Sequence, residues 1–192
     1  MHTPFIATAA FAALIATACT SQPDRQDAEF AGDVAAEAAP TTATLNDPTI
    51  VAIFDAANTA DIETGQLAAE RASTKEIRDF GKMLVHDHGV VRQQVRDLAQ
   101  KLGVTPTPPS DDASARAHAD AMSTLRSKYG VEFDKAFLDH EVRFHQEVID
   151  AVQSTLLPAI QNAELKDLVV KVAPAFDAHR IAAANLRSKI GD

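Results

Sequence analysis

The sequence has little of what stabilises disulfide-bonded or sheet-rich proteins. Among its 192 residues there are one cysteine (Cys19), no tryptophan, one tyrosine and seven glycines. A single cysteine excludes a disulfide within the chain. The scarcity of glycine and aromatic residues, together with abundant alanine, favours helices over sheets. No stretch alternates polar and apolar residues for long enough to predict a strand. The composition therefore predicts an all-α protein.

Positive charge is also scarce, and so are catalytic motifs. The chain has 18 Lys and Arg against 27 Asp and Glu, a formal net charge of -9. An acidic protein gains little from counterion release at phosphates, so we expect no nucleic-acid partner. There is no glycine-rich phosphate loop and no Gly-x-Ser-x-Gly elbow. We therefore predict no catalytic residue, and a non-enzymatic role is favoured.

The N-terminus carries the pattern of an exported protein. Residues 1–18 contain no Asp, Glu, Lys or Arg, and Phe5 to Ala18 form an apolar run too short to span a bilayer. This predicts a signal peptide over residues 1–18. The small residues before Cys19 resemble a bacterial lipobox, which implies lipidation of Cys19 and a membrane anchor. The alternative is an ordinary secretory signal that leaves Cys19 as a free thiol.

The rest of the chain divides into a tether and a helical domain. Residues 19–46 are rich in Ala, Thr, Asp, Glu and Pro and poor in large apolar residues, so we predict a disordered tether. Residues 47–192 show apolar residues at steps of three and four, which is typical of amphipathic helices. This part is long enough for one domain with a sizeable core.

Capping signals delimit the expected helices. Asp47 followed by Pro48 predicts a helix start, and this helix should end near Ala72. A capping box from Ser73 to Glu76 should open the second helix, which runs to Gly103. Ser110 or Asp111 would cap a short helix that ends near residues 129–130. Two more long helices are expected over residues 132–155 and 162–189, the latter kinked or broken at Pro174.

Four long helices with one short and one long connection fit a known architecture. The joint between the first two helices spans one or two residues, so these helices must be antiparallel neighbours. The connection between the second and third is long and includes the short helix. This pattern predicts a ferritin-like four-helix bundle with a short extra helix in the long connection.

Three of the expected helices each place one histidine on the buried stripe. His88 interrupts the apolar series between Leu84 and Val91. His145 interrupts the third helix together with Glu141, and His179 interrupts the fourth. The other histidines of the helical domain, His86, His118 and His140, lie off these stripes and should be solvated.

Two main interpretations of these histidines stay open, and acid–base catalysis is a third, less favoured one. In the first, Glu63, His88, His145 and His179 form a metal site for Zn, Fe, Mn or Cu, with Asp87 and Glu141 as further ligands or as hydrogen-bond acceptors behind the ligands. In the second, the histidines form a structural network with carboxylates, such as Asp87 with His179 or Glu63 with His88. No Glu-x-x-His sequence occurs, so a ferritin-type ferroxidase is not expected.

Four matching stretches resemble a known family. They are Ala60-Asp-Ile-Glu-Thr-Gly65, Phe80-x-x-x-Leu-Val-x-Asp-His88, Phe133-Asp-x-x-Phe-Leu138 with His145, and Ala173-Pro174 with His179. Together they resemble the DUF4142 family of exported bacterial proteins, which are expected to be ferritin-like and are often labelled outer membrane proteins. The resemblance implies a location in the cell envelope. Together with the lipobox-like residues before Cys19, it predicts a protein on the periplasmic side that is lipid-anchored to the outer membrane. The resemblance implies no activity, so we expect a binding or structural role, with transition-metal binding as the alternative.

Overall fold

The computed structural model describes residues 45–110 and 113–191. The expected signal peptide, Cys19 and all of the expected tether except Leu45 and Asn46 lie outside the described residues. Every secondary-structure element of the described part is a helix and none is a strand, as the composition predicts. None of its helices is long and apolar enough to cross a membrane.

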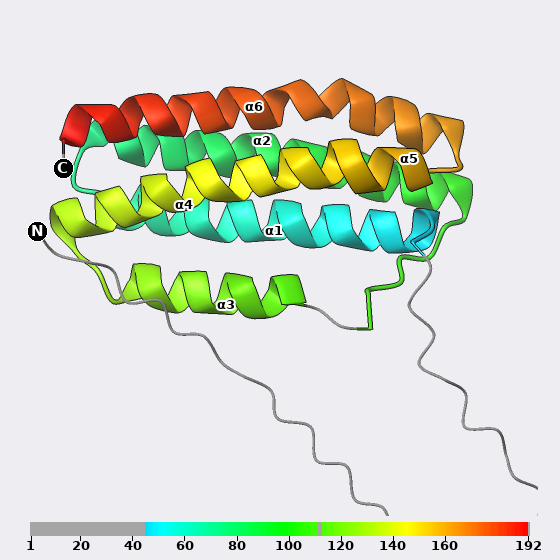
Figure 1. The fold of residues 1–192 in the computed structure, drawn as a ribbon, viewed down its shortest axis with the longest axis horizontal. Helices are drawn as coiled ribbons and strands as arrows, with labels where there is room; N and C mark the ends of the chain where they lie inside the picture. Colours follow the sequence, from blue (N-terminus) through cyan, green and yellow to red (C-terminus); the bar gives the residue numbers. More distant parts are fainter. Residues whose placement is uncertain (1–44, 111–112, 192) are drawn as a thin grey trace, which may run out of the picture. The chain divides into compact units, whose positions relative to one another are not determined.

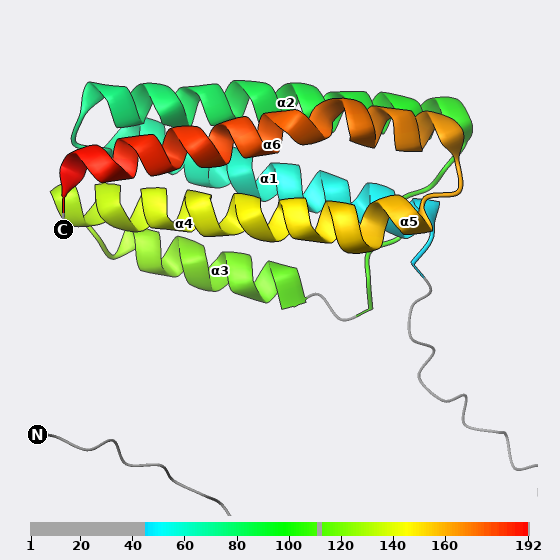
Figure 2. The same ribbon diagram turned by 45° about the horizontal axis from the view of Figure 1, so that its top comes forward.

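Four long helices form the bundle: α1 (Asp47–Arg71), α2 (Lys75–Leu102), α4 (Gly130–Ala151) and α6 (Ala163–Ile190). Around the bundle the order is α1, α2, α6, α4, so that α1 faces α6 and α2 faces α4 across the centre. Every neighbouring pair is antiparallel, whereas α2 and α4 run in the same direction (Figures 1 and 2). Because α2 and α4 run in the same direction, the chain between them must cross over the length of the bundle. This arrangement is the ferritin-like topology that the sequence predicts.

The crossover contains α3 (Ala113–Arg126), which lies along α1 and α4 outside the four-helix core (Figure 2). Beyond α4, the chain continues through one π-helical stretch, η1 (Val152–Leu156), and the short α5 (Leu157–Ala159). Of the two expected caps of the crossover helix, Asp111 lies outside the described residues. The helix expected to end at residues 129–130 ends at Arg126.

Two predicted caps are off by one residue. Asn46, not Asp47, caps α1, because the Asn46 side chain accepts the Thr49 N–H at 3.0 Å. The Asp47 carboxylate instead accepts the N–H groups of Gln161 and Asn162 at the start of α6, both at 2.9 Å. Thr74, not Ser73, caps α2, because Ser73 is hydrogen-bonded to the buried carboxylate of Asp134 on α4. Asp47 and Ser73, the two residues predicted to be caps, therefore connect helices that lie far apart in sequence.

Pro174 does not break α6. The helix is continuous from Ala163 to Ile190, so the prediction of two pieces is wrong. A proline inside a helix removes the N–H that would bind the carbonyl four residues earlier, here that of Val170. Pro174 and Val170 are both on the exposed side of α6, where water can hydrate that carbonyl.

The apolar core consists of two clusters separated by a polar layer. The first cluster contains Ile50, Phe54, Val91 and Val95, with Leu165 to Phe176 of α6. The second contains residues of α1 beyond Ala68, α2 up to Leu84, the start of α4 and Ala183. On all four helices the residues between the clusters are polar and buried. They are Asn58, Asp61, Thr64, His88, Glu141, His145 and His179.

A glycine pair sets the spacing of α1 and α2 close to this layer. A Cβ atom on Gly81 would lie 2.6 Å from the Gly65 carbonyl oxygen, and one on Gly65 would lie 2.8 Å from the Gly81 carbonyl oxygen. Real Cβ atoms do not approach so closely, so the two backbones meet only because both residues are glycine. This contact brings Asp61, one turn before Gly65, into reach of His88.

Candidate metal centre

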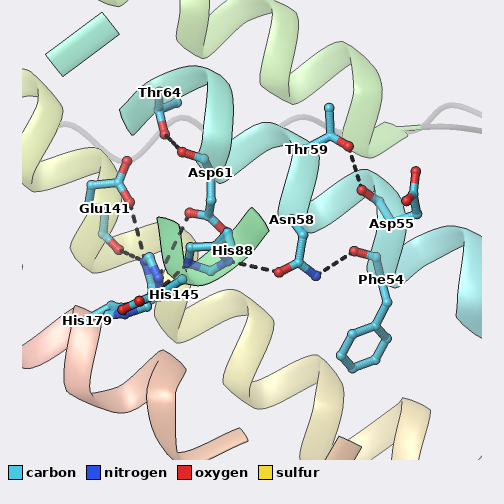
Figure 3. Close-up of polar contacts among 11 residues, drawn as sticks. Phe54, Asp55, Asn58, Thr59, Asp61, Thr64, His88, Glu141, His145 and His179 are labelled. Carbon is cyan, nitrogen blue, oxygen red and sulfur yellow. Dashed lines mark hydrogen bonds and ion pairs between the residues drawn. The ribbon is translucent and has the colours of Figure 1, made fainter. Parts of the chain in front are cut away.

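All four bundle helices contribute to one buried polar cluster (Figure 3). Helix α2 places His88 there, α4 places Glu141 and His145, α6 places His179, and α1 places Asn58 and Asp61. The ring centroids of the three histidines lie 5.0–5.5 Å apart. Phe176 stacks on the His88 ring at 5.9 Å and holds its orientation. The three histidines that the sequence placed on separate stripes therefore meet at the same height.

A chain of hydrogen bonds determines which nitrogen of His88 carries the proton. The Asn58 side-chain amide donates to the Phe54 carbonyl at 2.7 Å, so its oxygen is the atom that faces His88. His88 Nδ1 lies 2.9 Å from that oxygen and must donate to it. A neutral imidazole has one donor and one acceptor nitrogen. Nε2 of His88 is therefore the acceptor, with its lone pair directed into the cluster.

The other two rings are oriented in the same way. His145 Nδ1 donates to the Glu141 carbonyl at 2.9 Å, which leaves Nε2 as the acceptor. His179 Nε2 donates to the Asp87 carboxylate at 3.1 Å, which leaves Nδ1 as the acceptor. Each ring thus donates outward to a fixed oxygen, the arrangement that orients histidine ligands in metalloproteins.

Two of the inner nitrogens have the separation of metal ligands, and a nitrogen of the third ring lies nearby. One ring nitrogen of each of His88, His145 and His179 lies within 4.8 Å of the other two. His88 Nε2 and His179 Nδ1 are 3.1 Å apart, and in neutral rings both are acceptors. Ligands at about 2.0–2.1 Å from a tetrahedral ion lie roughly 3.3 Å from each other. A cation between the two nitrogens would turn a repulsive contact into two bonds.

Burial keeps two of the rings neutral. It lowers the pKa of His88 to about 3, with further lowering from His145 and His179. Burial also lowers the pKa of His145 to about 4, against the opposing hydrogen bond to the Glu141 carbonyl. Burial opposes ionisation of Asp87, but hydrogen bonds from His86 and His179 hold the pKa of Asp87 below its usual value. The cluster therefore combines neutral imidazoles with a carboxylate at its outer edge, where the Asp87 side chain is 39% exposed.

Two carboxyl groups lie on the inner side of the same cluster. Asp61 Oδ2 is 3.4 Å from His88 Nδ1, and Asp61 Oδ1 is 3.9 Å from His145 Nε2. Glu141 Oε2 is 3.4 Å from His145 Nδ1. Burial raises the pKa of Glu141 to about 8, and burial together with Glu141 raises the pKa of Asp61 well above its usual value. In the metal-free protein these two groups hold on to protons at neutral pH.

The structure brings together most of the predicted site residues, but not Glu63. His88, His145 and His179 converge, with Asp87 behind His179 and Glu141 beside His145. Glu63 lies at the surface of α1, where its carboxylate accepts from His118 at 2.9 Å. The carboxylate that α1 gives to the cluster is Asp61. Of the two networks that the sequence suggested, Asp87 with His179 is present and Glu63 with His88 is not.

Sequence reasoning missed Asn58 and Asp61 and misplaced His140. Asn58 and Asp61 fall on the buried side of α1 between Phe54 and Ala68, at steps of three and four, and this spacing was the available signal. His140 is buried rather than solvated, stacks on Phe144 at 5.6 Å and lies close to His118 of α3. Burial lowers the pKa of His140 to about 4. The apolar stripes of the four long helices do not indicate that α3 packs on α4, so they do not predict the burial of His140.

Comparison with known proteins assigns the chain to a family and identifies structures with the same fold. A family model described as "Domain of unknown function (DUF4142)" matches residues 31–186, and the chain belongs to this family. No curated protein matches the chain. Among solved structures, "CopM in the Cu(II)-bound form" is similar with a TM-score of 0.59 and 14% identity, covering 75% of this chain and 98% of that one. "CopM in the Ag-bound form (by co-crystallization)" has the same TM-score at 15% identity, covering 77% and 98%. At these identities the likeness concerns the fold alone.

Proposed function

We propose that this DUF4142 protein binds a divalent transition metal, Cu(II) foremost, through His88, His145 and His179 in the centre of its bundle. The observation that carries the proposal is the set of three acceptor nitrogens directed at one another, each fixed by an outward hydrogen bond. Neutral imidazole is the form that binds metals, and two of the rings are held in that form by burial.

The ligand chemistry supports Cu(II) as the first choice. Three imidazole nitrogens without a thiolate suit Cu(II) and Zn(II), and Cu(II) is the tighter binder at a given nitrogen site. The similar CopM structures are titled as Cu(II)-bound and Ag-bound, which supports testing copper first in this fold. His88 and His145 are each 1% exposed, so a metal there would be reached by ions and water rather than by larger substrates. This supports binding rather than catalysis.

A structural network without metal is the competing hypothesis. It requires an additional proton on His179, so that Nδ1 donates to His88 Nε2 while Nε2 donates to Asp87. In that arrangement His145 Nε2, which is buried, still has no hydrogen-bond partner among the described residues. Nitrogen NMR of the rings separates the two hypotheses, because a doubly protonated His179 in metal-free protein at pH 7 would support the network.

Metal content of matched histidine variants tests the proposal. We expect one equivalent of Cu(II) in the purified protein after loading and removal of loosely bound metal, and nitrogen couplings in its EPR spectrum. His88→Ala and His145→Ala should lose this copper while keeping their helical circular dichroism. His86→Ala is the control, because His86 is two residues from His88 and its side chain is 77% exposed. Equal copper in wild type and His88→Ala would refute the proposal.

We further propose that the protein is exported and attached to a membrane on the periplasmic side of the envelope through Cys19. The support is the uncharged apolar run of residues 5–18 and the small residues Ala16, Thr17 and Ala18 before Cys19. Mass spectrometry of the N-terminal peptide should show Cys19 as the first residue, with acyl chains attached. A Cys19→Ser variant should be released from the membrane fraction, and membrane retention of this variant would contradict lipidation.

A further inference from the structure

A second group of ligand atoms lies on the inner side of the three-histidine cluster. One carboxylate oxygen from each of Asp61 and Glu141 and one ring nitrogen of His145 lie within 4.8 Å of one another. All three side chains are buried, with exposed fractions of 3%, 0% and 1%. Figure 3 shows Asp61 and Glu141 approaching His145 from α1 and from α4. The group is therefore assembled by two helices rather than by neighbours in sequence.

The carboxyl groups of Asp61 and Glu141 interact with each other, and Glu141 also interacts with the Thr64 hydroxyl. Within the described part of the chain, Asp61 Oδ1, both carboxyl oxygens of Glu141 and His145 Nε2 are nevertheless buried without a hydrogen bond of normal geometry. Buried polar groups in native proteins are nearly always paired, and an unpaired one indicates a bound ion or water. Here four such atoms face a single small region. This concentration indicates one bound species rather than four separate defects.

No cationic side chain accompanies these two carboxyl groups in the described part of the chain. Within residues 45–110 and 113–191, the ion-pair contacts of Asp61 and Glu141 are to His88 and His145. Those rings are neutral in the hydrogen-bonded forms described above. A divalent cation that displaced the protons of both carboxyl groups would be balanced by the two carboxylates, without leaving net charge in the core.

We propose that Asp61, Glu141 and His145 form a second cation position, which takes an oxygen-preferring divalent ion such as Mn(II). The three-histidine position offers only nitrogen, whereas this one offers up to four carboxylate oxygens, and hard cations prefer oxygen. His145 has one acceptor nitrogen, so it serves one position at a time. The two positions therefore overlap and compete for His145. This inference goes beyond Cu(II) binding and does not depend on it, because two of its three ligands are not shared.

Separate Mn(II) and Cu(II) titrations of the purified full chain test the inference. Free Mn(II) gives a six-line EPR signal that disappears on binding. Wild type should bind one Mn(II), and Asp61→Asn and Glu141→Gln should each weaken Mn(II) binding at least tenfold. The same two variants should keep Cu(II) binding within a few-fold of wild type. Glu63→Gln is the matched control, because Glu63 lies two residues from Asp61 on the surface of α1.

The reciprocal variant completes the test. His179→Ala should weaken Cu(II) binding at least tenfold and leave Mn(II) binding unchanged, whereas His145→Ala should weaken both. Mn(II) binding that is absent from wild type, or equal in wild type and Asp61→Asn, overturns the second position. Loss of Cu(II) in Asp61→Asn also overturns it, since Asp61 would then be a ligand of the first ion.

Mn(II) binding without Cu(II) binding refutes the copper proposal alone. Glu141→Gln gives the same readout if Asp61→Asn fails to fold.

Discussion

At the scale of single residues, the orientation of the cluster depends on side chains that would not bind the metal. Asn58 is the clearest case, since its amide is held by the Phe54 carbonyl and its oxygen in turn holds His88 Nδ1. Partners of this kind fix the tautomer and ring orientation of a ligand, and their loss weakens metal affinity by roughly 10–100-fold. Asn58 on α1, which would not bind the metal itself, therefore determines which ring nitrogen of His88 on α2 can bind it.

Asn58→Ala should weaken Cu(II) binding by about tenfold, the lower end of that range. The effect is limited because Asp61 Oδ2 lies 3.4 Å from His88 Nδ1 and can accept its proton. A competition titration with a chelator of known affinity measures the change. Thr59→Ala is the control, since the Thr59 hydroxyl donates to the Asp55 carbonyl away from the cluster. Equal affinity in wild type and Asn58→Ala would mean that Asn58 does not select the tautomer.

Glu141 makes the stability of the metal-free protein depend on pH. Burial raises the pKa of Glu141 from 4.5 to about 8. The folded state therefore keeps a proton that the unfolded state loses, and the stabilisation by this group is full below pH 4.5 and is lost as the pH rises towards 8. The free energy of unfolding of wild type minus that of Glu141→Gln should fall over this window, by on the order of 1 kcal/mol per pH unit.

Urea unfolding in the presence of a chelator at pH 5, 6, 7 and 8 measures this difference. Taking the difference between the two proteins reduces the contribution of His88, His140 and His145, whose pKa values burial lowers. Asp61 adds to the difference, because Glu141 raises the pKa of Asp61. A difference that stays constant from pH 5 to pH 8 would show that Glu141 ionises normally in the folded protein.

At the scale of helices, the approach of α1 to α2 depends on Gly65 and Gly81. Replacing Gly81 with alanine would place a Cβ 2.6 Å from a backbone oxygen of α1, and backbone cannot move aside as a side chain can. We expect Gly81→Ala to destabilise the fold by about 1–3 kcal/mol, typical of overpacking, and to weaken metal binding by moving α1 away from His88.

Gly89→Ala, on the same helix, is the matched control. A Cβ at Gly89 meets nothing within 4 Å, and alanine is the better helix former. This variant should therefore stabilise the protein by roughly 0.5–1 kcal/mol. Thermal unfolding of both variants tests the pair. Similar melting temperatures would show that moving α1 and α2 apart does not lower the free energy of unfolding.

Helix patterns also explain which parts of the site could be predicted. His88, His145 and His179 interrupt strongly apolar stripes, so their direction towards the core was visible in the sequence. In the middle of α1, between Phe54 and Ala68, the apolar stripe is interrupted by several buried non-apolar residues in succession: Asn58, Asp61, Thr64 and Gly65. An exposed acid, Glu63, was therefore chosen in place of Asp61. The caps shifted by one residue because Asp47 and Ser73 are bound by α6 and α4, contacts that local sequence does not encode.

At the scale of the whole bundle, the sequence gives the phase of each histidine around its helix but not its height along the axis. A shift of one turn, 5.4 Å, would separate the rings. The height is fixed by packing, because the two apolar clusters lie on either side of the polar layer on all four helices. Aligning both clusters at once leaves one register, in which the three rings meet. The same packing makes the cluster a property of the folded state alone.

A ligand that binds only the folded state must stabilise it, and this gives the last prediction. With one site, free Cu(II) at 100 times its dissociation constant should raise the free energy of unfolding by about 2.7 kcal/mol. For a domain of this size that corresponds to a rise in melting temperature of roughly 5–10 °C. Each further tenfold increase in free Cu(II) should add about 1.4 kcal/mol.

His179→Ala distinguishes this linkage from nonspecific effects of copper. In this variant His88 and His145 keep their hydrogen bonds to Asn58 and Glu141, so it should fold, yet its melting temperature should not rise with Cu(II). His86→Ala should respond as wild type does, because its ring is at the surface. A metal-dependent rise that is equal in all three proteins would place the copper at surface groups. A rise in melting temperature that occurs only in proteins with His179 would place the copper in the polar layer where the four helices meet. Binding in that layer requires the folded bundle.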